Sequence, residues 1–138
     1  MTSDLVDSIK VAIKIRPLIK REKEENLPKQ RTVEGNYIAS TDQEMRKRGD
    51  GGFNFDHIFD ETTSNKDVFD TVIKPIVDAA VNGFNGTVIA YGQTSSEKTF
   101  TMMGGLNEPG IIMLAIEHMF DAIANTFKRE FLLRFNVI

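Results

Sequence analysis

Apolar and polar residues alternate over residues 8–15, which puts the apolar side chains on one face of an extended chain. This pattern predicts a half-buried strand. Arg16-Pro17 ends it, because proline has no N–H to donate to a ladder. The stretch Lys20–Arg31 is nearly all charged, is mixed in sign and contains Pro28, so it predicts a solvated loop.

Two more short strands are expected in the first half of the chain. Residues 33–39 are rich in β-formers and predict one of them, and the aromatic, partly alternating segment 53–59 predicts the other. The basic, glycine-rich stretch Arg46–Gly52 lies between them and predicts a turn or loop.

The segment Asp67–Asn82 has the pattern of an amphipathic helix. Its apolar residues recur at spacings of three and four. Ser64 and Asp67 form the pair expected at a helix start, and Gly83 is a typical helix stop. Pro75 lies inside the pattern and is expected to kink the helix or remove one hydrogen bond.

The remaining chain predicts a strand over Thr87–Tyr91, a helix beginning over Lys98–Met103, an interruption at Gly104–Gly110 and a strand at Glu130–Ile138. A second helical face is marked by Ile112, Ile116, Met119, Phe120, Ile123 and Phe127. Strands that alternate with helices indicate an α/β fold.

The composition narrows the function classes. The chain has 138 residues, 41% of them hydrophobic and 27% charged, which is ordinary for one globular domain. A formal net charge of −3 argues against nucleic-acid binding. The absence of cysteine excludes disulfides and thiolate chemistry. No apolar run approaches the ~20 residues of a membrane span, and residues 1–5 lack a secretory pattern, so a cytoplasmic or nuclear protein is expected.

The candidate chemistry lies in the stretch TVIAYGQTSSEKTFTMMG, residues 87–104. It nearly matches the phosphate-binding pattern G-x-x-x-x-G-K-[ST], with Gly92, Lys98 and Thr99 at the required offsets. Such a loop binds phosphate through backbone N–H groups and the lysine, while the final hydroxyl ligates Mg²⁺. A strand before the loop and a helix after it are the context that the motif requires.

Glu97 occupies the position of the second glycine. It adds a side chain where glycine permits unusual dihedral angles, and a negative charge where phosphate is expected. Two like charges about 4 Å apart repel by about 4 kcal/mol at an effective dielectric of 20. Spacing alone leaves two interpretations open: a phosphate loop, or a polar strand-to-helix turn in which Lys98 and Thr99 are solvated.

The flanking residues resemble the kinesin motor domain. GFNGTVIAYGQTSS (residues 83–96) and KTFTMMG (98–104) match its block G-x-N-G-T-(I/V)-x-A-Y-G-Q-T-(S/A)-S-G-K-T-x-T-M except at Glu97. VAIKIRPL (11–18) resembles the first strand of that family, and FNFDHIF (53–59) resembles its FxFDxVF strand. PGII and REFLLR follow in the family's order. The TMMG and REFLLR stretches look most like those of the centromere-associated mitotic kinesins. The resemblance covers residues 8–134, and residues 135–138 depart from it.

This resemblance implies the N-terminal strands and helices of a P-loop NTPase-like kinesin motor fold, and therefore a partial motor domain. It implies ATP and Mg²⁺ as ligands, with Thr99 on the metal. Lys14, Arg16, Pro17 and Tyr91 would lie on the adenine side; for Tyr91, core packing at a strand end is the open alternative. The phosphates would be wrapped by Gly92, Gln93, Thr94, Ser95, Ser96, Glu97, Lys98 and Thr99.

The resemblance also implies an ATP-dependent motor whose partners are microtubules or tubulin, in the cytoplasm and cytoskeleton, with the spindle or kinetochore as a finer location. The family's nucleotide-sensing switch segments follow the region matched here, so no catalytic residue is assigned. We therefore expect a truncated motor fragment with an impaired ATP-binding loop. The alternatives are a nucleotide-dead interaction module and a truncated product without a function of its own.

Overall fold

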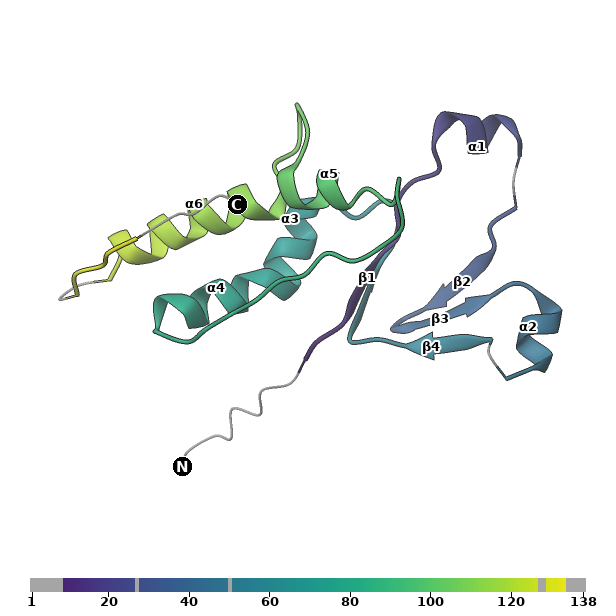
Figure 1. Ribbon diagram of the computed structural model, residues 1–138, viewed down its shortest axis with the longest axis horizontal. Coiled ribbons are helices and arrows are strands. Elements are labelled where there is room, and N and C mark those ends of the chain that lie inside the picture. Colours follow the sequence, from purple (N-terminus) through teal and green to yellow (C-terminus); the bar gives the residue numbers. More distant parts are fainter. Residues whose placement is uncertain (1–8, 27, 50, 127–128, 134–138) are drawn as a thin grey trace. The chain divides into compact units, whose positions relative to one another are not determined.

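The computed structural model describes residues 9–26, 28–49, 51–126 and 129–133 (Figure 1). The chain divides into two compact units, Met1–Thr63 and Ser64–Ile138. The described part of the first unit contains the β-strands and two short helices, and the described part of the second is helical.

The first unit contains a parallel pair of strands, β1 (Ala12–Lys14) and β5 (His57–Phe59). Asp56 extends the pairing at one end, because its carboxylate accepts a hydrogen bond from the Val11 N–H at 2.7 Å and its own N–H donates to the Val11 carbonyl at 3.1 Å. The strand predicted over residues 8–15 is confirmed in its centre only. Ile9 is 91% exposed and lies outside the ladder.

A second sheet in this unit is antiparallel, in the order β2 (Arg31–Glu34), β3 (Tyr37–Ser40) and β4 (Gly52–Asn54). The prediction of a single strand over residues 33–39 is wrong, because the chain reverses at Gly35-Asn36. Gly35 takes a φ of 55°, which a hairpin turn with glycine at its first central position requires. The segment predicted as one strand over 53–59 is divided between the two sheets as β4 and β5.

Two short helices, α1 (Lys20–Glu24) and α2 (Gln43–Lys47), lie in the charged stretches of the first unit. The predictions of a loop throughout residues 20–31 and of a turn over 46–52 are wrong at these positions. Charge pairs four residues apart support α1, and the side chain of Asp42 caps α2. Neither helix buries a residue, so hydropathy has no signal for them.

The second unit begins with one continuous helical run: α3 (Asn65–Val68), the π-helical turn η1 (Phe69–Ile73) and α4 (Lys74–Val81). It confirms the helix predicted over residues 67–82. The predicted disturbance at Pro75 takes the form of the wide turn before it, in which the Lys74 N–H donates to the Phe69 carbonyl five residues earlier. Pro75 then lies in the first turn of α4, where no N–H is needed.

Both predicted ends of this run are confirmed. The Ser64 hydroxyl accepts a hydrogen bond from the Asp67 N–H at 3.1 Å, and the Asp67 carboxylate accepts one from the Ser64 N–H at 3.1 Å. The Ser64 hydroxyl also donates to the Asp67 carboxylate at 2.5 Å, and this bond, together with the one from the Ser64 N–H, lowers the pKa of Asp67. At the other end Gly83 takes a φ of 94°, and the N–H groups of Gly83 and Phe84 donate to the last helical carbonyls in the pattern of a Schellman motif.

Two further helices complete the second unit: α5 (Lys98–Met103) and α6 (Ile111–Ala124), separated by the loop Gly104–Gly110. Both were predicted. Figure 1 shows α6 lying along α4, and the two helices are in contact. The core consists of Val68, Phe69, Ile73, Val77 and Ile111. The apolar face predicted for α6 is only partly covered, since Ile112 is 38% and Phe120 51% exposed; Phe127 lies outside the described residues.

The strand predicted over Thr87–Tyr91 is wrong in this structure: the segment runs from α4 to α5 without a ladder to any described residue. A strand needs a neighbour for its backbone N–H and C=O groups, and no described segment supplies one. Ile89 is accordingly 82% exposed. Of the strand predicted over 130–138, residues 130–133 form none, and 134–138 lie outside the described residues.

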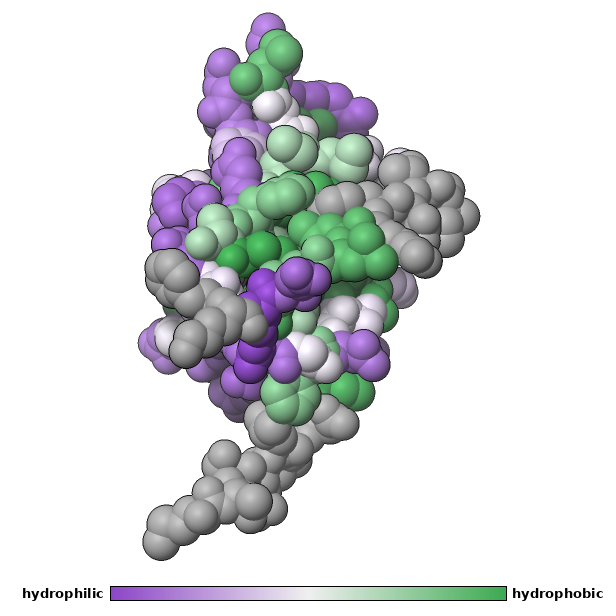
Figure 2. All heavy atoms as spheres, turned by 90° about the vertical axis from the view of Figure 1, so that its left-hand side faces the viewer, coloured by the Kyte–Doolittle hydropathy of each residue, from purple (hydrophilic) through white to green (hydrophobic). Residues whose placement is uncertain are grey.

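The second unit also leaves large apolar side chains in contact with solvent, and green apolar atoms are prominent on the face drawn in Figure 2. Those exposed by half or more are Phe84, Ile89, Tyr91, Met103, Leu106, Phe120 and Leu132. None of the helices in the described ranges has the length and apolarity needed to cross a bilayer.

Candidate functional site

The predicted phosphate loop, Gly92–Thr99, leads directly into α5. Lys98 and Thr99 are the first two residues of this helix, where backbone N–H groups have no acceptor within the helix. The Ser96 N–H donates to the Gln93 carbonyl at 3.2 Å and forms the turn before the helix. The sequence-predicted residues of the loop are therefore together in one turn at a helix start.

The Lys98 ammonium folds back across the loop. Its Nζ atom donates to the carbonyl oxygens of Gly92 at 2.5 Å and Gln93 at 2.6 Å, and it lies 3.4 Å from the Ser96 hydroxyl. These contacts fix the positive charge inside the concave side of the loop. A bound phosphate would offer this ammonium an acceptor that is itself charged, in place of the neutral carbonyl oxygens.

Gly92 is needed for this closure. A β-carbon at position 92 would lie 2.6 Å from the Ser96 Oγ and 3.3 Å from the Ser96 Cβ. A side chain there would have to displace the Ser96 side chain, which faces Gly92 across the loop. The first glycine of the pattern thus has a steric reason in this structure.

Glu97 has the backbone conformation that the pattern reserves for glycine. It is in the left-handed region, with φ 62° and ψ 24°, and Ser95 also has a positive φ, of 65°. For a residue with a β-carbon this conformation costs roughly 1–2 kcal/mol. The Glu97 carbonyl still accepts from the Thr101 N–H at 2.9 Å, so α5 begins normally. The backbone therefore starts α5 with glutamate in a left-handed conformation.

The residues present fit a phosphate ligand in shape, with one adverse charge. Lys98 supplies a positive charge, helix-start N–H groups supply donors, and the exposed hydroxyl of Thr99 is free to ligate a metal held by phosphate oxygens. The Glu97 carboxylate has no hydrogen-bond donor among the described residues and adds a negative charge. The described ranges contain no cluster of histidine and acidic side chains that would hold a metal ion alone.

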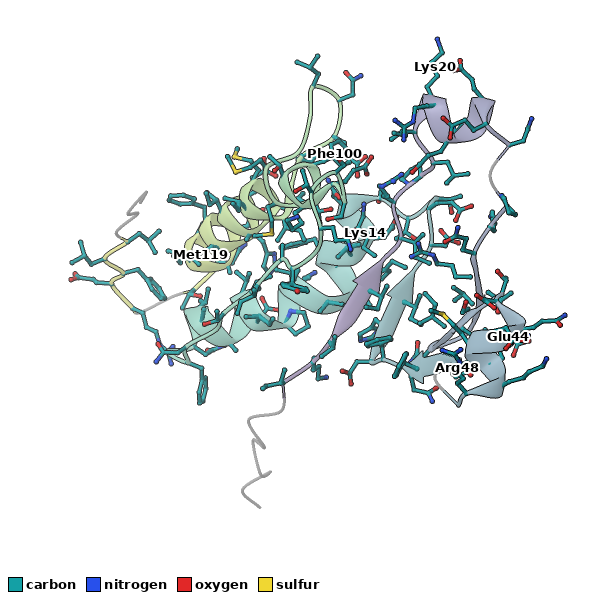
Figure 3. The ribbon with its side chains drawn as sticks, turned by 45° about the vertical axis from the view of Figure 1, so that its right-hand side comes forward. Lys14, Lys20, Glu44, Arg48, Phe100 and Met119 are labelled. Atoms are coloured by element: carbon teal, nitrogen blue, oxygen red, sulfur yellow. The ribbon has the colours of Figure 1, made fainter. Side chains whose placement is uncertain are left out.

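Lys14, Arg16 and Pro17, predicted to lie beside adenine, belong to the first unit, whereas Tyr91 and the phosphate loop belong to the second. Lys14, labelled in Figure 3, is the last residue of β1. Tyr91 is 98% exposed, so the alternative that it packs in a core at a strand end is wrong in this structure.

Arg16 has a structural partner that the sequence did not indicate. Its guanidinium forms a fork with Glu22 in α1, with both N–O distances at 2.7 Å, and it also donates to the Pro17 carbonyl at 2.9 Å. The same Glu22 carboxylate accepts from the Ile19 N–H at the start of α1. Arg16 and this N–H lower the pKa of Glu22 to about 2. Arg16 thus fastens α1 to the end of the first strand.

Sequence reasoning also missed Asn65, which is fully buried beside α5. Its side chain donates to the carbonyls of Phe100 and Pro109. A single polar residue directly after a helix cap has no periodic pattern. The only signal in the sequence was its place at a helix start, where most residues are exposed.

Comparison with known proteins agrees with these features. The profile of the kinesin motor domain matches residues 14–138. The chain is 47% identical over 130 residues to the kinesin-like protein KIN-7I of Oryza sativa subsp. japonica, and 40% identical over 129 residues to the human centromere-associated protein E. These matches cover 94% and 92% of this chain but only 10% and 5% of those proteins.

Solved structures of kinesins also match this chain. A fast kinesin matches with a TM-score of 0.78 at 36% identity, over 88% of this chain and 34% of that structure's chain. KIF14[391-755], solved with ADP and in complex with a microtubule, matches with a TM-score of 0.74 at 34% identity, over 89% of this chain and 35% of its own. The fold is thus that of the kinesin motor, of which this chain spans about a third. The chain belongs to the kinesin motor domain family.

Proposed function

We propose that this chain provides the phosphate-binding part of an ATP-dependent microtubule motor, and that Glu97 weakens its hold on the nucleotide. The observation that supports this most directly is the loop Gly92–Thr99, closed around the Lys98 ammonium at the start of α5. Membership in the motor family supplies the class of ligand.

In this proposal each loop residue has a defined task. Lys98 holds the β- and γ-phosphate oxygens, and the N–H groups at the start of α5 donate to the same phosphates. Gln93, Thr94, Ser95 and Ser96 form the rim of the loop. Bound Mg²⁺, with Thr99 among its ligands, neutralises the phosphate charge. No described residue is assigned a catalytic role.

The proposed partner is the microtubule, because a similar motor has been solved in complex with one. A cytoskeletal location follows from that partner. The similarity to a protein named for its association with the centromere makes the spindle or kinetochore the finer proposal. The adenine-side roles of Lys14, Arg16, Pro17 and Tyr91 belong to the same proposal.

The effect of Glu97 separates into two physical contributions. Its carboxylate repels the phosphates, and its β-carbon strains the left-handed backbone. The first contribution acts on nucleotide affinity. The second acts on the stability of the loop whether or not a nucleotide is present.

Titration with ATP and Mg²⁺, monitored by calorimetry, tests this proposal with three proteins: the unmodified chain, Glu97→Gln and Glu97→Gly. Glu97→Gln removes the charge but keeps the backbone strain, so it is the matched control for Glu97→Gly. We expect at least about tenfold tighter binding by Glu97→Gln, corresponding to about 1.4 kcal/mol, and a similar affinity for Glu97→Gly, whose additional effect is on the stability of the loop. Lys98→Ala should abolish binding.

Micromolar binding by the unmodified chain, with no gain in either variant, would show that Glu97 does not impair the loop. A chain that is folded by circular dichroism but binds no nucleotide in any of these forms would contradict the phosphate-binding proposal. That result would favour the second candidate function, an interaction module that binds no nucleotide. The negative charge of Glu97 in the loop is the observation that favours this candidate.

A further inference from the structure

Asn65 is the first residue of α3 and is completely buried, with 0% of its surface exposed. Its side-chain Nδ2 donates to the carbonyl oxygen of Phe100 at 3.1 Å and to that of Pro109 at 3.3 Å. Its backbone N–H donates to the Glu108 carboxylate at 2.5 Å. Asn65 therefore contacts two stretches of chain that are distant from it in the sequence, and we call these three hydrogen bonds the Asn65 clamp.

The acceptors of the clamp lie at the two ends of one loop. Phe100, labelled in Figure 3, is in α5, and its carbonyl also accepts from the Gly104 N–H at 2.8 Å. Glu108 and Pro109 come directly before Gly110, which precedes α6. The Gly105 N–H donates to the Glu108 carbonyl at 2.9 Å, so the two ends are also joined to each other.

The two ends approach so closely that only glycine fits at the crossing. A β-carbon on Gly104 would lie 2.4 Å from the Gly110 nitrogen, and one on Gly110 would lie 2.3 Å from the Gly104 nitrogen. The end of α5 is thus fixed against the start of α6, and both are held by the first turn of α3.

We infer that Asn65 is a positioning residue for the phosphate loop; the link to nucleotide rests on the function proposed above. α5 has six residues, and a helix this short has little stability of its own. Its first two residues are Lys98, the proposed phosphate ligand, and Thr99, the proposed Mg²⁺ ligand. The clamp holds the carbonyl of the next residue, Phe100. The direction in which Lys98 and Thr99 are presented therefore depends on the clamp.

The chemistry of the side chain supports this role over simple filling of space. Asn65 brings an Oδ1 atom into the interior, where it has no hydrogen-bond partner among the described residues. Buried polar atoms without a partner are rare because they are costly. Leucine has the same number of side-chain heavy atoms and would avoid that cost, but it has no hydrogen-bond donor. The two N–H donors of the carboxamide account for an asparagine at this site.

The test substitutes Asn65→Leu in the full chain, with Asn125→Leu as the matched control. Asn125 follows α6, is exposed, and its side chain makes only a local bond to the Asp121 carbonyl at 2.8 Å. Hydrogen–deuterium exchange of the Thr101–Gly104 amides is measured in each protein. We expect exchange about tenfold faster or more in Asn65→Leu, and unchanged exchange in Asn125→Leu. Affinity for ATP with Mg²⁺ should fall by a similar factor in Asn65→Leu alone.

A second variant, Glu108→Ala, removes one bond of the clamp without touching the core. It should speed exchange of the same amides by about threefold. Unchanged exchange in Glu108→Ala and Asn65→Leu overturns the inference; if Asn65→Leu does not fold, unchanged exchange in Glu108→Ala does so alone. Absence of ATP binding by the unmodified chain, Glu97→Gln and Glu97→Gly alike rejects the proposed function instead, and the exchange rates still decide the role of Asn65.

Discussion

Each of the two units of this chain is stabilised internally by a different kind of interaction. In the described part of the first unit the only buried apolar residue is Ala39, and the fold rests on two small sheets, ion pairs and side-chain caps. In the described part of the second unit five buried apolar side chains, with the fully buried Asn65, form a packed core between helices. Backbone pairing dominates one unit and side-chain packing dominates the other.

This difference predicts which substitutions will change the stability of each unit. Buried apolar area gives several kcal/mol per large side chain, whereas an exposed ion pair gives a fraction of one. The second unit should therefore respond strongly to truncation of single side chains. The first should respond mainly to pH and to changes at turns and caps. The predictions that follow test this contrast, beginning with the largest expected effect.

The largest effect is expected from Phe69→Ala in the second unit. Phe69 is 4% exposed and makes an edge-to-face contact with His118, with 5.9 Å between the ring centroids. Its truncation should lower the free energy of unfolding by about 3–5 kcal/mol. Phe53→Ala in β4 is the control, since Phe53 is 61% exposed and should change stability by less than about 1 kcal/mol. Urea denaturation followed by circular dichroism measures both, and equal losses would contradict the contrast.

An intermediate effect is expected from Ser64→Ala, which removes the cap of α3. The substitution should cost about 1 kcal/mol, because the Asp67 N–H loses its acceptor. Thr71→Ala removes an exposed hydroxyl that bonds the Asp67 carbonyl in the same helical run and serves as the control. A loss in the control as large as that in Ser64→Ala would show that the cap is not what starts the helix.

In the first unit a pH-dependent effect is expected at Glu22. Its pKa is about 2 in the folded chain, below the usual 4.5, so its ionised form stabilises the fold above pH 4.5. That contribution should be lost as the pH falls from about 4.5 to about 2. Glu22→Gln should remove this pH dependence, measured through the amide signals of α1 and β1 by NMR. Glu24 is exposed on the same helix, and the control substitution Glu24→Gln should leave this pH dependence unchanged.

The smallest effect is expected from Lys20→Ala, also in α1. The Lys20–Glu24 pair spans 3.8 Å, and its side chains are 91% and 64% exposed. Removing it should cost at most about 0.5 kcal/mol in urea denaturation. A loss as large as that from Ser64→Ala would show that ion pairs contribute far more to the first unit than the contrast allows.

Much of the helical unit could be predicted from the sequence, because its signals are local. The Ser64–Asp67 pair, the stop at Gly83 and the apolar repeat between them act within a few residues of one another. The predicted helix at Lys98 is also confirmed, and so is the expectation that position 97 requires unusual dihedral angles.

What could not be predicted depends on partners far along the chain or on charge alone. The segment Thr87–Tyr91 has strand-forming residues, but a strand also requires a neighbour, which the described chain does not provide. The helices α1 and α2 bury nothing and so leave no hydrophobic period. The side chain of Asn65 donates hydrogen bonds to carbonyl oxygens at least 35 residues away, so its role has no local signal in the sequence. The ligand roles of the loop residues stay predictions.

The backbone at Glu97 has a consequence for the history of this loop. Since residue 97 already takes left-handed dihedral angles, glycine would enter there without any movement of the main chain. Glutamate and glycine codons differ by a single base at the second position. The complete phosphate-binding pattern therefore lies one point mutation away, at a position whose main chain already has the dihedral angles that glycine adopts readily.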